Sequence, residues 1–195
     1  MATKLSTAEE RRPLVIAAAI TAFARMGYRG TTVADVGAGA RISSAYVFKL
    51  FPSKEQLALD LFLRHHQGLA EALAEAQRPA KGLRAKVETI VRCYCEWADR
   101  DWTLFAYHLL NQHSFLIQVP DGMANPVTVV RDVISQAMKA GEIPKRNIDL
   151  AAASAIGVVM QAATYKVYGR FTGDLSDHVR FFADAAWAVL AVKEK

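Results

Sequence analysis

The chain has 195 residues, of which 52% are hydrophobic, and it carries 24 Lys and Arg against 19 Asp and Glu. A composition this apolar can bury a core, which excludes an intrinsically disordered chain. The two cysteines, Cys93 and Cys95, lie two positions apart in a predicted helix and point away from each other, which excludes a disulfide framework and favours a reducing, cytoplasmic compartment.

The apolar stretches of the sequence argue against export and against a membrane-spanning helix. The first residues contain no continuous apolar run of the kind that a signal peptide needs, so export is not expected. The uncharged run Leu150 to Tyr165 includes Ser154 and Gln161 and is shorter than the roughly 20 apolar residues that span a bilayer. We therefore predict a buried helix here and no membrane partner.

The periodicity of the apolar residues is helical almost throughout. They recur at three- and four-residue spacing, and no alternating stretch is long enough for a strand, so we predict an all-α fold of about nine helices. The first helix is predicted from about Arg11 to Met26, with Gly27 as its C-terminal stop. Its apolar stripe consists of Leu14, Val15, Ala18, Ala22, Phe23 and Met26.

Two very short helices follow the first. Thr32, with Asp35 three residues later, is typical of an N-cap and opens a helix that ends near Ala38. After a tight connection at 39–42, Ser43 caps a third helix that ends near Phe51.

The third helix has a predicted inner side and is followed by a long fourth helix. Val47 and either Leu50 or Phe51 are expected to pack inward. Ser53 and Gln56 form the capping box of the fourth helix, which continues to residue 77.

The basic charge is concentrated at this end of the chain. Residues 1–54 hold eight Lys and Arg, Lys4 included, and three acidic residues, so the whole formal net charge of +5 lies in this segment. Such an asymmetry suggests a polyanion partner, although a solvated basic surface is the alternative. Two short helices joined by a tight turn and framed by basic residues form a helix-turn-helix pattern, in which the second helix fits the major groove of double-stranded DNA.

A family resemblance covers residues 11–62. The run TTVADVGAGARISSAYVFKLFPSKEQL, together with the long first helix that ends in Gly27, resembles the N-terminal DNA-binding domain of the TetR family of transcriptional repressors. The resemblance implies a homodimer in which each subunit places its third helix in a major groove. It also implies a larger C-terminal helical domain that binds a small inducer and dimerises. We accordingly expect a DNA-binding domain at 1–54 and a ligand-binding and dimerisation domain at 55–195.

The residues expected to contact DNA line the helix-turn-helix and the starts of its neighbouring helices, where free backbone N–H groups favour phosphate. They are Thr31, Thr32, Arg41, Ser43, Ser44, Tyr46, Phe48, Lys49 and Lys54.

Three of these positions depart from the family pattern. Arg41 stands where the turn commonly has Gly, so either its backbone takes a positive φ or the turn differs. Phe48 replaces a frequent Tyr, and Tyr46 replaces a frequent Thr or Ser. Ordinary packing is the alternative for Tyr46 and Phe48, and a solvated side chain is the alternative for Lys49 and Lys54.

Five further helical segments are predicted beyond residue 77, at about 82–99, 102–117, 126–140, 148–168 and 175–192. The first three concentrate large amphipathic side chains, and a small-molecule pocket needs an apolar lining with a few polar groups. TetR-like proteins place their inducer among the corresponding helices, and plain core packing is the alternative for each residue. The candidate ligand-binding residues are Tyr94, Trp97, Trp102, Phe105, His108, Phe115, Met123 and Met160.

The last two segments are the predicted dimer interface. In 148–168 the run from Ala151 to Gly157 is rich in small residues, which lets helices approach closely. In 175–192 one broad face carries Val179, Phe182, Ala183, Ala186, Val189 and Leu190. The alternative is that both helices merely complete the core of a single chain.

No catalytic or metal-binding motif is recognised, and no cofactor is expected. Gly37 and Gly39 begin a dinucleotide-like pattern, but Ile42 stands at the third glycine position and no strand precedes it. His108 and His113 have no Cys, Asp or Glu at zinc-ligand spacing.

The sequence therefore favours a non-enzymatic, ligand-responsive repressor that binds a palindromic operator. A dimeric regulator without an inducer, or an activator, is the first alternative. A soluble carrier of apolar metabolites is the second.

Overall fold

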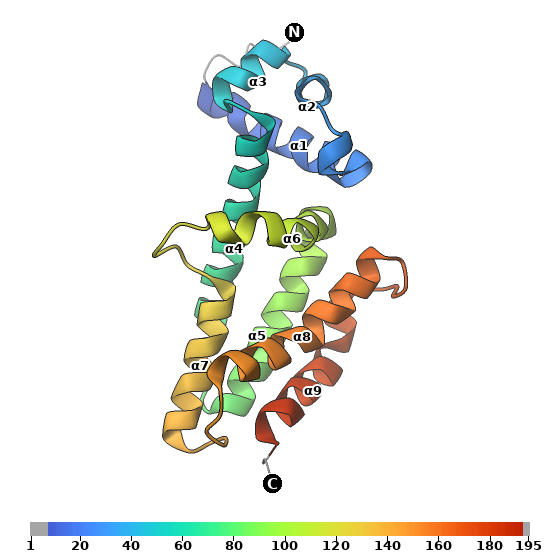
Figure 1. Cartoon of the computed structure of the whole chain (residues 1–195). Coiled ribbons are helices and arrows are strands. Elements are labelled where there is room, and N and C mark those ends of the chain that lie inside the picture. The colour runs from blue at the N-terminus through green and yellow to red at the C-terminus, as the bar shows by residue number, and fades with distance from the viewer. Residues whose placement is uncertain (1–7, 193–195) are drawn as a thin grey trace. The chain divides into compact units, whose positions relative to one another are not determined.

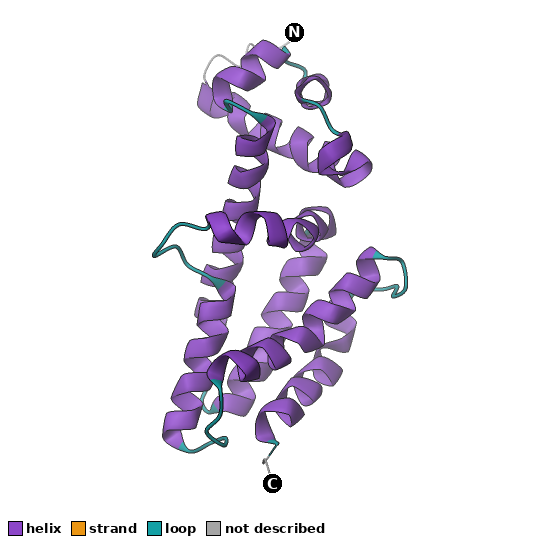
Figure 2. Ribbon diagram, in the orientation of Figure 1, coloured by secondary structure: helices purple, strands orange, loops and turns teal. Residues whose placement is uncertain are grey.

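The computed structural model describes residues 8–192, and within that range it contains α-helices and two short 3-10 helices but no strand (Figure 2). The all-α prediction is confirmed. Lys4, which was counted in the basic segment, lies outside the described residues.

Each of the nine predicted helices is found among residues 8–192, with ends that differ by a few residues (Figure 1). The helices in chain order are α1 (Ala8–Gly30), α2 (Val33–Ala40), α3 (Ser44–Leu50), α4 (Lys54–Gln77), α5 (Leu83–Arg100), α6 (Trp102–Phe115), α7 (Pro126–Ala140), α8 (Ile148–Val167) and α9 (Val179–Ala191). The 3-10 helices are η1 (Leu116–Gln118), directly after α6, and η2 (Leu175–His178), directly before α9.

Helix α1 breaks where the sequence predicted a stop. Gly27 has φ 72° and ψ 161°, a non-helical conformation that lies in the region where glycine is favoured over other residues. The apolar stripe of α1 differs in part from the prediction, because Leu14 and Met26 are exposed whereas Ala19 is fully buried. Small residues at the centre of the helix let α2 pack close to it, and the larger side chains at its two ends remain at the surface.

The chain forms two compact units. The first comprises the chain up to His65 together with Thr103–Val119, and the second comprises His66–Trp102 and the chain from Pro120 onward. The first unit is thus larger than the expected domain at 1–54. Its core includes residues of α4 and α6 beside those of α1, α2 and α3, namely Val15, Ala19, Phe23, Val36, Ala40, Val47, Phe51, Leu57, Ala58, Leu61, Phe62, Tyr107 and Phe115.

Tyr107 explains why a segment of α6 belongs to the first unit. Its ring stacks on Phe23 with 5.4 Å between centroids, and its hydroxyl donates a 2.7 Å hydrogen bond to the carbonyl of Ala58. Burial raises the pKa of this phenol, so it stays protonated and remains a donor. The contact attaches α6 to both α1 and α4.

The second unit is built from α5, α7, α8 and α9, with α8 packed on α7 and α9, and α9 packed on α5 (Figure 1). Asp99, at the end of α5, connects three segments of this unit. Its carboxylate accepts hydrogen bonds from Lys166 Nζ at 3.1 Å, from Leu175 N at 3.1 Å and from Ser176 N at 2.8 Å. Burial alone raises the pKa of Asp99. The backbone N–H groups of Ser176 and Leu175 and the Lys166 ammonium outweigh it and hold this pKa below its ordinary value.

Helix α8 is less buried than the sequence predicted. Only four of its residues are buried, and they are Ala151, Ala152, Val159 and Ala163. In the part of the chain that the structure describes, α8 is also the single helix long and apolar enough to cross a membrane. One such helix is weak support for a membrane span, because helices of soluble proteins reach the same length and hydropathy.

The predicted dimer face of α9 lies inside the chain. Five of its six residues, Val179, Phe182, Ala183, Ala186 and Leu190, are buried, and the sixth, Val189, is partly buried. Helix α9 packs on α5 and α8. The expectation that this face meets a second subunit is corrected accordingly. A helical stripe shows that a face is covered, but it does not distinguish a covering helix of the same chain from one of a partner.

Candidate nucleic-acid interface

The turn between α2 and α3 is set by local hydrogen bonds. Thr32 caps α2 in a reciprocal box, in which its Oγ1 accepts from Asp35 N at 3.2 Å and its N–H donates to Asp35 Oδ2 at 2.8 Å. Hydrogen bonds from the Thr32 hydroxyl and backbone lower the pKa of Asp35. The carboxylate is therefore charged and engaged with the cap at neutral pH.

The backbone of Arg41 adopts the left-handed conformation that ends α2. Its φ is 56° and its ψ is 41°, so of the two alternatives for this departure from Gly, the positive φ is the one observed. The N–H of Arg41 donates to the Ala38 carbonyl at 3.1 Å, and that of Ile42 donates to Gly37 at 2.9 Å. These bonds fix the backbone of Arg41 just before α3, and its side chain is exposed there.

Gly37 makes the tight turn possible. A Cβ atom at this position would lie 2.9 Å from the carbonyl oxygen of Ile42 and 3.4 Å from Ser44 N. Backbone atoms cannot yield to such a contact as a flexible side chain can. The closeness of α2 to the start of α3 therefore depends on the absence of a side chain here.

Helix α3 has an inner and an outer side. Ser43 caps it by accepting a hydrogen bond from Tyr46 N at 3.2 Å. Val47 and Phe51 are 1% and 2% exposed, which confirms the predicted inner residues and selects Phe51 over Leu50 as the more buried. The outer side carries Ala45, Phe48 and Lys49, which are all exposed.

Tyr46 is flanked by two cations. The Arg11 guanidinium of α1 lies 4.6 Å from the centre of the Tyr46 ring, and Lys49 Nζ lies 5.9 Å from it. Tyr46 and Ser44 are partly buried. Arg11 was not among the predicted site residues, and its place at the start of the first helix gave no sign that it would meet the third.

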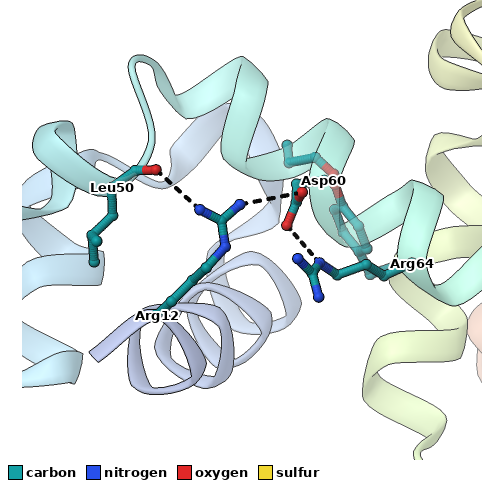
Figure 3. A network of polar contacts seen from close by, with 6 residues as sticks. Arg12, Leu50, Asp60 and Arg64 are labelled. Carbon is teal, nitrogen blue, oxygen red and sulfur yellow. Dashed lines mark hydrogen bonds and ion pairs between the residues drawn. The ribbon is translucent and has the colours of Figure 1, made fainter. Parts of the chain in front are cut away.

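Arg12, next to Arg11, serves the fold. Figure 3 shows its guanidinium between α3 and α4, where Nη1 donates to the Leu50 carbonyl at 3.3 Å and Nη2 lies 3.4 Å from Asp60 Oδ1. Arg64 binds the other oxygen of Asp60 at 2.8 Å, and the Arg12 guanidinium also lies 4.2 Å from the centre of the Phe51 ring. This network attaches the C-terminal end of α3 to α1 and α4.

Two of the predicted DNA contacts are turned inward instead. Thr31 is 1% exposed, and its hydroxyl lies 2.8 Å from the Gly27 carbonyl and 3.1 Å from that of Ala22. Lys54 Nζ donates to the carbonyls of Tyr28 and Thr31 at 3.0 and 2.9 Å and lies over the Tyr28 ring. Both side chains hydrogen-bond to backbone carbonyls in the last part of α1 or just after it, which corrects their assignment to phosphate.

The eight candidate ligand residues are divided between the two units. In the first unit, Phe105, His108 and Phe115 are buried. His108 stacks on Phe62 at 4.5 Å and lies 4.8 Å from His65, both measured between ring centroids. Neither Phe62 nor His65 was predicted, although both lie on the apolar side of α4.

The other five candidates belong to the second unit and are partly buried: Tyr94, Trp97, Trp102, Met123 and Met160. Trp97 packs so closely on Gly68 that a Cβ there would lie 3.2 Å from its ring, and Lys166 Nζ lies 4.4 Å from the centre of the Trp102 ring. Burial raises the pKa of the Tyr94 phenol. Their role in ligand binding stays a prediction.

The thiols do not have the properties of nucleophiles. Burial raises the pKa of Cys93, and it raises that of Cys95 to about 12, so both remain protonated at neutral pH. Within residues 8–192 no group of three or more His, Cys, Asp or Glu side chains is placed to hold a metal ion.

Comparison with known proteins agrees with this geometry. Residues 15–61 match the family model described as bacterial regulatory proteins, tetR family. The HTH-type transcriptional regulator HbdR of Aromatoleum sp. (strain CIB) is 32% identical over 106 residues, which cover 51% of this chain and 44% of HbdR. The matched segment thus spans less than half the length of that relative.

Solved structures show the same fold over nearly the whole chain. The transcriptional regulator FadR from Bacillus subtilis, in complex with stearoyl-CoA, superposes with a TM-score of 0.81 at 16% identity and covers 93% of this chain and 99% of its own. The TetR family transcriptional regulator PfmR from Thermus thermophilus superposes with a TM-score of 0.71 at 15% identity, covering 93% and 99%. The helix-turn-helix geometry, the family match at residues 15–61 and this shared fold agree that the N-terminal segment is similar to bacterial regulatory proteins of the tetR family, and that the whole chain has the fold of such regulators.

Proposed function

We propose that the protein is a ligand-responsive transcription regulator that binds a palindromic operator as a homodimer and represses transcription until a small apolar or aromatic molecule releases it. The observation that carries the proposal is the outer side of α3. Val47 and Phe51 hold this helix against its unit, while Phe48, Lys49 and the neighbouring Arg41 stay at the surface. A capped helix with an exposed, basic side suits the major groove.

The phosphate contacts are proposed for the exposed polar residues around α3. Thr32, Arg41, Ser43 and Lys49 are exposed, and Arg11 lies against Tyr46 at the edge of the same surface. Cations at such positions attract phosphate and fix the register of the helix in the groove.

The dimer is proposed to form through the outer sides of α8 and α9. Leu150, Tyr165 and Tyr168 on the α8 side are 61%, 47% and 64% exposed, and Phe181 on α9 is 70% exposed. A Cβ at Gly157, in the middle of α8, would meet nothing within 4 Å. Large apolar residues around a stretch of small ones give an exposed surface suited to a symmetric helix–helix interface.

The ligand is proposed to be bound in the second unit, whose five partly buried aromatic and Met side chains offer an apolar surface with a few polar groups. Because the FadR neighbour was solved with stearoyl-CoA, acyl-CoA thioesters are the first compounds to test. A ligand releases DNA only if its affinity differs between the DNA-bound and free forms.

Selection of bound duplexes from a random DNA pool tests the proposal. We expect enrichment of an inverted repeat, a dimer by light scattering, and a fall in operator affinity as salt rises. Stearoyl-CoA and an aromatic acyl-CoA are then titrated into the complex, and fluorescence anisotropy measures release.

Three results would change the proposal. Failure to enrich any sequence overturns DNA recognition, and ligand binding without enrichment would indicate a carrier of apolar metabolites. Enrichment without release by any ligand would indicate a regulator that lacks an inducer.

A further inference from the structure

The outer side of α3 is apolar at its centre. Phe48 is 49% exposed, and Ala45, one helical turn before it, is also exposed. Residues three apart on a helix are neighbours, so the two side chains form one apolar strip on the surface. Lys49 borders this strip, and Arg41 is exposed just before the helix.

The orientation of the strip is fixed by both ends of the helix. Ser43 caps the N-terminal end, and the Arg12 guanidinium holds the Leu50 carbonyl at the other. A rotation that buried Phe48 would remove Val47 and Phe51 from the core, where they are 1% and 2% exposed. Phe48 is therefore held at the surface by the packing of its neighbours.

A phenyl ring and a methyl group have no hydrogen-bond donor or acceptor, so they cannot recognise the polar edges of bases. In the major groove only thymine presents an apolar group, its C5-methyl, and Ala and Phe are among the side chains that contact it. The cations at the edges of the strip complement the phosphates on either side of the groove.

We propose that the strip formed by Ala45 and Phe48 selects thymine in the operator half-site by packing on C5-methyl groups, and that Phe48 is the main determinant of this preference. The proposal rests on the DNA-binding function proposed above. Lys49, in contrast, contributes affinity through phosphate and little discrimination between thymine and its demethylated analogue.

Substitution of deoxyuridine for thymine, one position at a time, tests the proposal with the full-length protein and the duplex selected from the random pool. Deoxyuridine lacks only the C5-methyl group and pairs with adenine as thymine does. Burial of one methyl group predicts a roughly three- to tenfold loss of affinity at one or two positions of each half-site. Fluorescence anisotropy at fixed salt measures the loss.

The variants assign the effect to Phe48. For Phe48→Ala we expect equal affinity for the thymine and deoxyuridine duplexes at those positions, and for Phe48→Leu we expect part of the preference to remain. Lys49→Ala is the matched control from the same side of α3, and we expect it to bind both duplexes more weakly with an unchanged ratio. Circular dichroism and thermal melts verify that each variant is folded.

The outcomes separate this proposal from the one on which it rests. If wild-type protein binds the selected duplex tightly and deoxyuridine has no effect at any position, the thymine proposal is overturned while operator binding stands. Persistence of the deoxyuridine penalty in Phe48→Ala also overturns it. If no duplex is selected at all, the DNA-binding function itself fails.

Discussion

The two units differ in which kind of residue, predicted to face a partner, stabilises the fold instead. In the first unit, Lys54, which the sequence assigned to DNA, holds the fold together with Arg12, because they donate to the backbone carbonyls of Tyr28 in α1 and Leu50 in α3. In the second unit, apolar residues that the sequence assigned to a partner hold the fold, because Phe182 and Leu190 are buried within the chain. Among the large apolar residues that stay exposed are Phe48 in the first unit and Phe181 in the second. They are therefore better guides to function than the basic charge of the N-terminal segment or the apolar stripe of α9.

The largest expected loss of stability comes from breaking the ion-pair network of the second unit, and breaking that of the first should cost less. Asp99→Ala removes the nearer carboxylate of Lys166, at a site where the two side chains are 11% and 13% exposed, and leaves only the exposed Asp174 at 3.6 Å. It also leaves the backbone N–H groups of Leu175 and Ser176 without their acceptor, so we expect a loss of about 3 kcal/mol in the free energy of unfolding. Asp60→Ala, the matched change in the first unit, affects a more exposed network and should cost about 1 kcal/mol. Urea unfolding of both variants measures the difference, and equal losses would contradict it.

The Asp99 network also predicts a pH dependence. The folded pKa of Asp99 lies below its ordinary value of 3.8, so its stabilising contribution is present above that pH and is lost as pH falls through the folded pKa. Wild-type stability should therefore fall more steeply than that of Asp99→Ala in this acidic range, which urea unfolding at several pH values measures.

Gly37→Ala tests the close turn of the first unit. The new Cβ would meet the Ile42 carbonyl at 2.9 Å, so we expect a loss of about 2–3 kcal/mol in stability together with loss of operator binding. Gly157→Ala is the control in the second unit, where nothing lies within 4 Å, and helix propensity should stabilise the single chain by roughly 0.5–1 kcal/mol. Thermal unfolding compares the two, and a stable Gly37→Ala variant would refute the packing argument.

Substitution of Lys54 and of Lys49 compares a lysine that stabilises the fold with one that is exposed to solvent. Lys54→Ala removes two hydrogen bonds to carbonyls, so we expect about 1–2 kcal/mol of lost stability and little change in the salt dependence of DNA binding. Lys49→Ala should leave stability within about 0.5 kcal/mol and reduce the salt slope by roughly one. The reverse pattern, in salt titrations and urea unfolding, would restore Lys54 as a phosphate contact.

The smallest effect is expected at Arg41. Because its φ is 56°, Arg41→Gly should relieve about 1 kcal/mol of backbone strain and raise the melting temperature slightly. Loss of the side chain should at the same time weaken binding to all DNA sequences. A fall in stability would show that the Arg41 side chain supports the turn.

The helices and their caps were predictable because the signals are local. Thr32 with Asp35, Ser43, and Ser53 with Gln56 each cap a helix as expected, since the donor and acceptor are three residues apart. Gly27 breaks α1 for a similarly local reason. The inner side of α3 followed from helical spacing alone, with only the choice between Leu50 and Phe51 left to the structure.

The candidate site was predicted less completely, because several of its contacts join residues far apart in the chain. The contact of Arg11 with Tyr46, like that of Lys54 with Tyr28, depends on how α1 lies against its neighbours. The same holds for His65 and His108, whose proximity requires α4 and α6 to pack together. Residue types at given positions do not contain that information.

The sequence by itself determined the all-α fold, the helices to within a few residues at their ends, the helix-turn-helix and the resemblance of the N-terminal segment to the tetR family, because periodicity, caps and turns act over a few residues. Only the tertiary structure decided which cations face solvent, which side of α9 is covered by its own chain, and that Phe48 stays at the surface. These outcomes depend on which distant groups satisfy buried carbonyls and apolar surface, and such competition is resolved only when the helices pack.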